Sequence, residues 1–260
     1  MGTATMGTAR TMYPVRLEPR KLVVSRDGRP VPALIWIPPG TREQLPLVLV
    51  GHDGNGHKRG PTVVAMAHGL AREHRIATLA IDGPASGERA ANDADARALR
   101  REDRTSFRRR YYLDCYDSMV ADWRAALDAA QQLPEIGRGP VGYWGLSMGT
   151  RFGVPLIVAE PRIRAAVIGL FGHLDGSDVS QRIYDDAGKV DIPILFLQQL
   201  ADEVVPQRAY YELFKQIGTQ NKRLHANPGG RHAVPMSELA ASRSFLARRL
   251  DPELAVAPDA

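Results

Sequence analysis

Residues 141–153 read VGYWGLSMGTRFG, in which a serine lies between two glycines directly after a short apolar run. We expect the apolar run to form a buried strand and the residues after Ser147 to form a helix, so that the serine occupies the sharp turn between them. The nucleophile of such a turn takes strained backbone angles, and side chains at Gly145 and Gly149 would strike the adjacent strand and helix. The helix also directs its free N–H groups toward the serine. The pattern predicts a reactive hydroxyl raised out of a sheet.

The same alternation of strand and helix extends over most of the chain. Apolar or β-branched runs occur at 22–24, 33–37, 47–51, 76–82, 141–145, 165–170, 192–198 and 222–226. Helical candidates lie at 61–73, 114–132, 148–160, 206–217 and 236–249. The runs from Leu47 onward are continuous rather than alternating, as expected for strands buried on both faces. The pattern predicts an α/β fold with a mostly parallel, eight-stranded sheet and helices on both faces.

The N-terminal edge of the expected sheet follows another pattern. The first two apolar runs are joined by SRDGRPVP (25–32), whose Asp27-Gly28 pair favours a hairpin turn. We therefore expect antiparallel strands at this edge, before the sheet becomes parallel. Residues 83–113 are too long for an ordinary connection, and we expect them to form a small lid or rim together with the 171–188 loop.

The composition indicates one domain with a large core. The chain has 260 residues, of which 44% are hydrophobic, so we expect a single domain over 1–260 with frayed ends at 1–12 and 252–260. No apolar stretch approaches the roughly 18 residues that span a bilayer, and the N-terminus lacks the apolar centre of a secretory signal. The lone Cys115 excludes an intramolecular disulfide. We expect a soluble, cytoplasmic protein. Its net charge of +5 is too small to indicate a nucleic-acid partner, and we expect no membrane partner.

A serine nucleophile needs a base, and the base needs an acid that holds it in the correct tautomer. IPILFLQQLADEVVP (192–206) supplies Asp202 in the loop after one expected strand, and RLHANPGGRHAVP (223–235) supplies His232 in the loop after the next. The chain order Ser, Asp, His is the one expected for a strand–serine–helix turn in an α/β sheet. We predict that Ser147, Asp202 and His232 form a catalytic triad.

Other residues compete for the acid and base roles. Asp175 in FGHLDG is the main alternative acid, because the loop after the preceding strand can also reach the histidine, and Glu203 is a weaker one. Asp202 could instead cap the helix that follows it. Among the histidines, His225 falls inside an expected strand and His173 comes too early in the chain for the usual order.

With these motifs, the chain resembles the α/β-hydrolases over about 34–250, and most closely their dienelactone hydrolase and small serine esterase branch. GLSMG (145–149), LADEVVP (200–206) and GGRHAVP (229–235) stand where that family carries its nucleophile, acid and base. GHDGNGH (51–57) stands where it carries the oxyanion loop. The resemblance implies a hydrolase that needs no cofactor.

Two residues depart from the family pattern. Gln199 follows a strand where the family often has glycine, and Ser147 replaces the cysteine nucleophile of dienelactone hydrolases, so lactone specificity is not implied. The default reaction is hydrolysis of a small carboxylic ester through an acyl-enzyme. The same triad could cleave an amide, thioester, lactone or carbon–carbon bond, and a non-catalytic member of the fold would only bind a ligand.

The oxyanion hole of such enzymes needs two backbone donors. Met148 provides the first by its position after the nucleophile. For the second we favour the amide of Gly54, with Asp53 as the alternative, because GHDG follows an apolar run. We expect His52 to shape this loop and His57 to face solvent. No pair of histidines has convincing ligand spacing with a carboxylate, so we expect no metal.

Five arginines recur at offsets typical of one helix face; they are Arg97, Arg100, Arg101, Arg104 and Arg108. Three interpretations remain open: a solvated stripe paired with nearby carboxylates, guanidinium groups presented to an acidic substrate, or the interface of a homodimer. The candidate substrate contacts are His52, His173 and Arg104.

Overall fold

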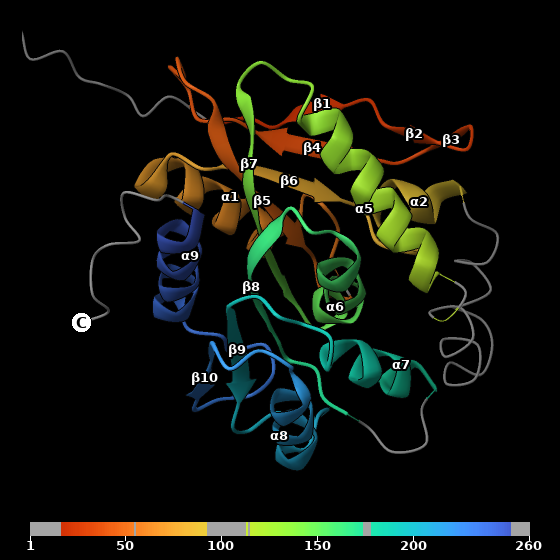
Figure 1. The fold of residues 1–260 in the computed structure, drawn as a ribbon, viewed down its shortest axis with the longest axis vertical. Coiled ribbons are helices and arrows are strands. Elements are labelled where there is room, and N and C mark those ends of the chain that lie inside the picture. The colour runs from red at the N-terminus through yellow and green to blue at the C-terminus, as the bar shows by residue number, and fades with distance from the viewer. Residues whose placement is uncertain (1–16, 55, 93–112, 114, 174–177, 251–260) are drawn as a thin grey trace, which may run out of the picture.

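The computed structural model describes residues 17–54, 56–92, 113, 115–173 and 178–250, and a single large sheet runs through them (Figure 1). In sheet order its eight strands are β1 (Arg20–Leu22), β4 (Ala33–Trp36), β6 (Ala77–Ile81), β5 (Leu45–Gly51), β7 (Ile136–Leu146), β8 (Ile163–Gly169), β9 (Ile194–Gln199) and β10 (Lys222–Asn227). The strands from β6 to β10 in this order are parallel to one another. The predicted fold class is confirmed.

The N-terminal edge is antiparallel, as predicted from the hairpin signal. β4 pairs antiparallel with both β1 and β6. Beside it, β2 (Ser25–Arg26) and β3 (Arg29–Pro30) form a separate two-stranded hairpin. Its turn residues, Asp27 and Gly28, have φ angles of 51° and 73°, the left-handed conformation that a tight two-residue hairpin turn requires.

Helices cover both faces of the sheet (Figure 1). One face carries α1 (Pro61–His74) and α9 (Met236–Leu250), which also pack on each other. The other carries α5 (Tyr116–Ala130) and α6 (Met148–Ala159), followed by α7 (Asp178–Ala187) and α8 (Gln207–Gln216). Neighbouring residues of the central strand β7 point to these opposite faces, since Gly142 lies against Leu246 and Leu250 of α9 while the Tyr143 ring lies against α6.

In the parts of the chain that the structure describes, no helix combines the length and the apolar character that crossing a membrane requires.

The topology gathers the loops that carry the candidate site. Because β5 to β10 run parallel, their carboxyl ends meet at one edge of the sheet, and the loops after β5, β7, β9 and β10 lie there. The expected lid at 83–113 begins with the short helix α2 (Gly87–Asn92), and 93–112 lies outside the described residues. The expected frayed ends also lie outside them.

Candidate active site

Ser147 occupies the predicted sharp turn between β7 and α6. Its backbone has φ 59° and ψ −112°, a strained combination for a residue with a side chain. A Cβ atom at Gly149 would lie 2.9 Å from the carbonyl oxygen of Gly51 on β5, and one at Gly145 would lie 3.0 Å from the backbone of Gly149. Both glycines are therefore required by close backbone approaches, which confirms the reason inferred from the sequence.

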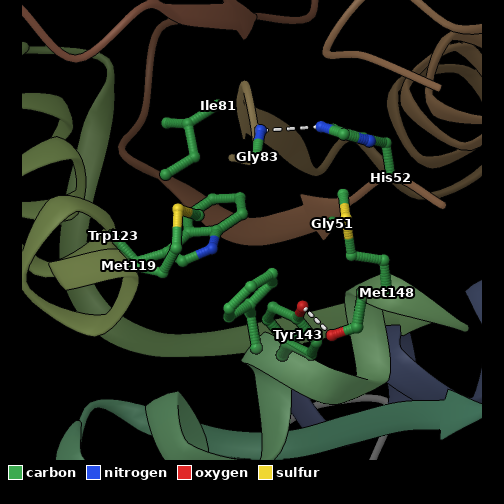
Figure 2. A pocket seen from close by; sticks show the side chains of 10 residues that line it. Gly51, His52, Ile81, Gly83, Met119, Trp123, Tyr143 and Met148 are labelled. Carbon is green, nitrogen blue, oxygen red and sulfur yellow. Dashed lines mark hydrogen bonds between the residues drawn. The ribbon is translucent and has the colours of Figure 1, made fainter. Parts of the chain in front are cut away.

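Two buried hydroxyl groups tie the turn to the sheet. Tyr143 donates to the carbonyl of Gly149 at 2.6 Å (Figure 2), and burial raises the pKa of this phenol, so it stays neutral. Thr150 Oγ1 lies 2.6 Å from the carbonyl oxygen of Gly169 at the end of β8 and accepts the Gly169 N–H at 2.8 Å. The helix α6 contains Pro155 but continues to Ala159. Pro155 lies in its second half, so the first turn, which follows Ser147, is helical.

Asp202 lies in the loop after β9 with its side chain fully buried. Its Oδ1 accepts the amides of Val204 and Val205 at 2.8 and 2.9 Å, and its Oδ2 accepts the hydroxyl of Tyr210. Burial pushes the pKa of this carboxyl upward, but the hydrogen bonds from Tyr210 and the two amides, with the charge of Arg231, outweigh it and hold the pKa below its usual value. Asp202 is therefore a fixed, ionised acceptor at the edge of the sheet.

Arg231, which sequence reasoning missed, connects Asp202 to Ser147. Its Nη1 donates to Asp202 Oδ2 at 2.8 Å, and its Nη2 donates to Ser147 Oγ at 2.7 Å and to the carbonyl of Leu170 at 2.8 Å. The side chain is only 12% exposed. The one available signal was its place directly before the predicted base, next to an acid that a long cation can reach. As folded, an arginine fills the space between the candidate acid and the candidate nucleophile.

His232 follows Arg231 in the turn between β10 and α9, and it is exposed. Among the described residues it makes no hydrogen bond to Ser147 or Asp202. Its assignment as the base therefore stays a prediction, and it requires a movement of this turn. The carboxylate of Glu203, the weaker alternative acid, accepts a hydrogen bond from the backbone amide of Arg231 at 3.2 Å. Asp175, the main alternative acid, lies outside the described residues.

His52 connects the loop after β5 to the turn after β6. The ring is buried, and its Nδ1 lies 2.7 Å from the carbonyl oxygen of Asp53 while its Nε2 accepts the amide of Gly83 at 2.7 Å (Figure 2). Burial lowers the pKa of His52, which keeps the ring neutral with its proton on Nδ1. This geometry agrees with the expectation that His52 shapes the loop. It leaves neither ring nitrogen directed at a substrate.

A buried ion pair anchors the other end of the same loop. Lys58 Nζ lies 2.5 Å from Asp82 Oδ2 and 2.8 Å from Glu88, and the Lys58 amide donates to Asp82 Oδ1 at 3.0 Å. Asp82 also accepts the Glu88 amide at 2.9 Å, so it organises the turn after β6 as well as the loop after β5. Between these anchors, Gly54 is exposed. The assignment of Gly54, Asp53 and Met148 as oxyanion donors stays a prediction.

The other histidine candidates have partners outside the Ser147–Arg231–Asp202 group. His173 donates its backbone N–H to Ala209 at 3.0 Å and stacks its ring 4.4 Å from that of Tyr184. His225, on β10, is bonded to Glu238 at 2.8 Å. Exposed His57 accepts the amide of Arg59 at 3.1 Å. The arginine stripe, with Arg104, lies outside the described residues.

An apolar pocket adjoins the loop after β5 (Figure 2). Met119 and Trp123 of α5 form one wall, Phe152 and Met148 of α6 form another, and Ile81 of β6 closes it. His52 and Gly83 meet at its edge. The pocket therefore lies beside the residue whose amide is the expected oxyanion donor, on the face of the sheet covered by α5 and α6.

A known family model matches part of the chain. A family model described as "Serine aminopeptidase, S33" matches residues 173–238, a segment that contains Asp202, Arg231 and His232. A comparison with curated proteins gave no significant match.

Solved structures match almost the whole chain. A cold-adapted esterase from an Arctic intertidal metagenomic library is 36% identical, with a TM-score of 0.75 over 90% of this chain and 93% of the esterase. Est1E from Butyrivibrio proteoclasticus (19% identity, TM-score 0.62, 88% of this chain and 98% of that one) shares the fold. So does a dienelactone hydrolase from Anabaena variabilis (18% identity, TM-score 0.64, 90% and 96%). With the strained serine turn, the parallel sheet and a 36% identical relative over nine-tenths of its length, the chain belongs to the α/β-hydrolase family.

Proposed function

We propose that this chain is a serine carboxylesterase that works through an acyl-enzyme. The observation that carries the proposal is the backbone of Ser147, which is held in a strained turn at the start of α6 by glycine contacts that no other residue would permit. Such a turn costs stability, and strain of this kind concentrates at functional sites. The 36% identical relative, an esterase, supports the same reaction class.

In the proposed mechanism His232 removes the proton of Ser147 Oγ, which attacks the acyl carbon of the ester. The amides of Met148 and Gly54 hold the oxyanion that forms, and losing one such donor costs about 10² to 10³ in rate. Protonated His232 gives its proton to the leaving alcohol. Water, deprotonated by the same imidazole, then attacks the acyl-enzyme and releases the acid. Asp202 stays ionised throughout and orients the imidazole.

The environment of Asp202 fits this role. Its buried carboxylate is held by three donors from the chain besides Arg231, so it is fixed before any base arrives. A base that approached Ser147 along the path now taken by Arg231 would meet the same Oδ2 atom. The proposal therefore requires only the turn after β10 to rearrange.

We also propose that the protein acts in the cytoplasm, because a chain with a single cysteine is consistent with a reducing compartment. We propose a small ester as its substrate. Amide hydrolysis is the second candidate, favoured by the family model of serine aminopeptidases that matches residues 173–238.

The test is labelling with a fluorophosphonate probe, combined with turnover of p-nitrophenyl esters and matched anilides. We expect labelling and ester turnover that both disappear in Ser147→Ala. Ser237→Ala, which changes an exposed serine of α9, is the control and should label normally. Well-folded wild-type protein that neither labels nor turns over any ester would favour a non-catalytic ligand-binding role. Faster turnover of anilides than of esters would favour the amide reaction.

A further inference from the structure

The guanidinium of Arg231 occupies the space that a catalytic imidazole needs. In a Ser-His-Asp triad the imidazole donates to the acid from one nitrogen and accepts the serine proton at the other. Here Arg231 contacts the same two atoms, Asp202 Oδ2 at 2.8 Å and Ser147 Oγ at 2.7 Å. We propose that Arg231 is a latch on the esterase site, and that Ser147 becomes a nucleophile only when Arg231 leaves and His232 takes its place. This inference rests on the proposed function.

Arg231 is unable to act as the base itself. A guanidinium carries five N–H donors and no acceptor, and it stays protonated in proteins. It therefore donates to Ser147 Oγ instead of accepting from it. The hydrogen bond stabilises the resting hydroxyl and leaves its proton without a receiver. While Arg231 stays in place, the serine is oriented but not activated.

The turn that carries both residues has the backbone freedom to exchange them. Gly229 has a φ angle of 149°, a conformation that L side chains rarely adopt, and Gly230 follows it. Arg231 and His232 are neighbours, with one directed into the site and the other exposed. An imidazole is shorter than an arginine side chain, so the turn must also move toward Ser147. The exchange must break or re-form the hydrogen bonds that hold the turn. The carbonyl of Gly229 accepts the Ala201 amide at 3.0 Å, and the carbonyl of Gly230 accepts Gln199 Nε2 and the Ala233 amide, both at 3.0 Å. The Arg231 amide donates to Glu203 at 3.2 Å.

Removing the latch does not leave a buried charge without partners. Asp202 keeps the hydroxyl of Tyr210 and the amides of Val204 and Val205 when Arg231 is truncated. Arg231→Ala should therefore fold. If the active arrangement is a minor population, the apparent rate equals the intrinsic rate multiplied by that population. Truncation of Arg231 should then raise the rate.

The experiment compares Arg231→Ala, His232→Ala and the double variant. Two rates are measured on each: kcat/KM for p-nitrophenyl acetate and the second-order rate of fluorophosphonate labelling at Ser147. We expect Arg231→Ala to raise both rates about tenfold or more, corresponding to about 1.4 kcal/mol. His232→Ala should lower turnover by about 10³-fold or more. The double variant should match His232→Ala, because the gain depends on the imidazole.

Two further variants separate the latch from the simple loss of a positive charge. Arg164→Ala removes an exposed arginine at the opposite end of β8, and it should leave both rates within twofold of wild type. Arg231→Lys keeps the charge but loses the forked pair of donors, so its rates should lie between wild type and Arg231→Ala. A crystal structure of the phosphonate adduct should show the His232 imidazole bonded to Asp202, with Arg231 turned away.

The latch is overturned if Arg231→Ala lowers either rate or leaves both within twofold of wild type, or if Arg231 still bridges Asp202 and residue 147 in the adduct. A wild-type enzyme that labels at Ser147 but does not respond to Arg231→Ala refutes the latch and leaves the esterase proposal intact. If neither wild type nor Arg231→Ala labels at Ser147, the esterase proposal itself fails.

Discussion

The two sides of Ser147 are built differently. On the β5 and β6 side, His52, Lys58 and Asp82 are all buried, and each bonds to a partner across two loops. On the β9 and β10 side, a buried carboxylate faces a turn with two glycines, and the predicted base on that turn is exposed. One side is held by buried hydrogen bonds and an ion pair, whereas in the proposed mechanism the other must rearrange before His232 can take the proton of Ser147.

This difference matches the demands on each side. Donors for an oxyanion act best when they need no reorganisation during the reaction, so rigid anchors suit them. A turn that can move suits the proposed base His232, because the proposal requires His232 to be kept away from Ser147 in the resting state. Loop motions set the rate of many enzymes. The contrast teaches that a carboxylate and a serine can both be held in place without a triad being assembled between them. The following substitutions challenge or refine this contrast, from the largest expected effect to the smallest.

Asp202→Asn should give the largest loss, because in the proposed mechanism it removes the charge that orients and stabilises the imidazolium of His232. We expect kcat to fall by up to about 10⁴-fold, with the fold retained, measured as steady-state ester turnover beside circular dichroism. A nearly silent Asp202→Asn together with an inactive Asp175→Asn would show that the acid was assigned to the wrong loop.

Lys58→Met tests the rigid side. The side chains of Lys58 and Asp82 are 4% and 0% exposed, so the substitution leaves a buried carboxylate without its cation. We expect the free energy of unfolding to fall by about 3–5 kcal/mol in urea titrations. Lys189→Met, which breaks an exposed pair with Asp186, is the matched control and should have little effect. Equal effects of the two would mean that the β5 side is not rigidly anchored.

Gly149→Ala tests the contact between α6 and β5. The added Cβ would lie 2.9 Å from the Gly51 carbonyl, and neither backbone can yield easily. We expect a loss of about 1–3 kcal/mol in unfolding free energy, together with slower labelling of the displaced Ser147. Gly139→Ala adds a methyl group with no atom within 4 Å and should change neither quantity. Tolerance of Gly149→Ala would indicate a looser turn than described.

Tyr210→Phe should have the smallest effect. It removes one donor to Asp202, so the pKa of that carboxyl rises toward its usual value. A depressed carboxyl pKa stabilises the fold above the unfolded value near about 4, and this stability is lost as pH falls through the folded pKa. We therefore expect a loss of about 1 kcal/mol at neutral pH that shrinks in acid, measured by urea unfolding at several pH values. Tyr211→Phe, at an exposed neighbouring position, is the control. A loss of stability in Tyr210→Phe that does not depend on pH would show that it does not act through the ionisation of Asp202.

The elements of the fold were largely predictable because buried strands appear in the sequence as continuous apolar runs. Continuous apolar runs such as 165–170 and 192–198 became the central strands β8 and β9, and Asp27-Gly28 became the hairpin turn. The helix α7 was not predicted, since 171–188 was interpreted as a loop. Its sequence, DVSQRIYDDA, is mostly polar, and its contacts with α6 and α8 are tertiary.

The site was predictable only where local geometry decides it. The glycines around Ser147 follow from the turn itself, and the structure agrees with them. The Lys58–Asp82 pair joins residues 24 positions apart and left no motif. Arg231 was missed for another reason. A motif gives the identities of residues 231 and 232, but the rotation of the turn decides which of them faces Ser147.

The Tyr143 ring has a consequence for how this sequence can vary. A Cβ at Gly51 or Gly145 would come within 2.6 Å of its hydroxyl oxygen, and one at Gly153 would overlap the ring. Three glycines on two strands and a helix thus make room for a single aromatic side chain. A mutational library that varies any one of them alone should return only glycine. One that lets position 143 shrink at the same time should recover larger residues at 153, where the three nearest atoms all belong to Tyr143. Gly145 should stay fixed, because the Gly149 backbone also lies 3.0 Å from its Cβ position, so positions 143 and 153 form the epistatic pair.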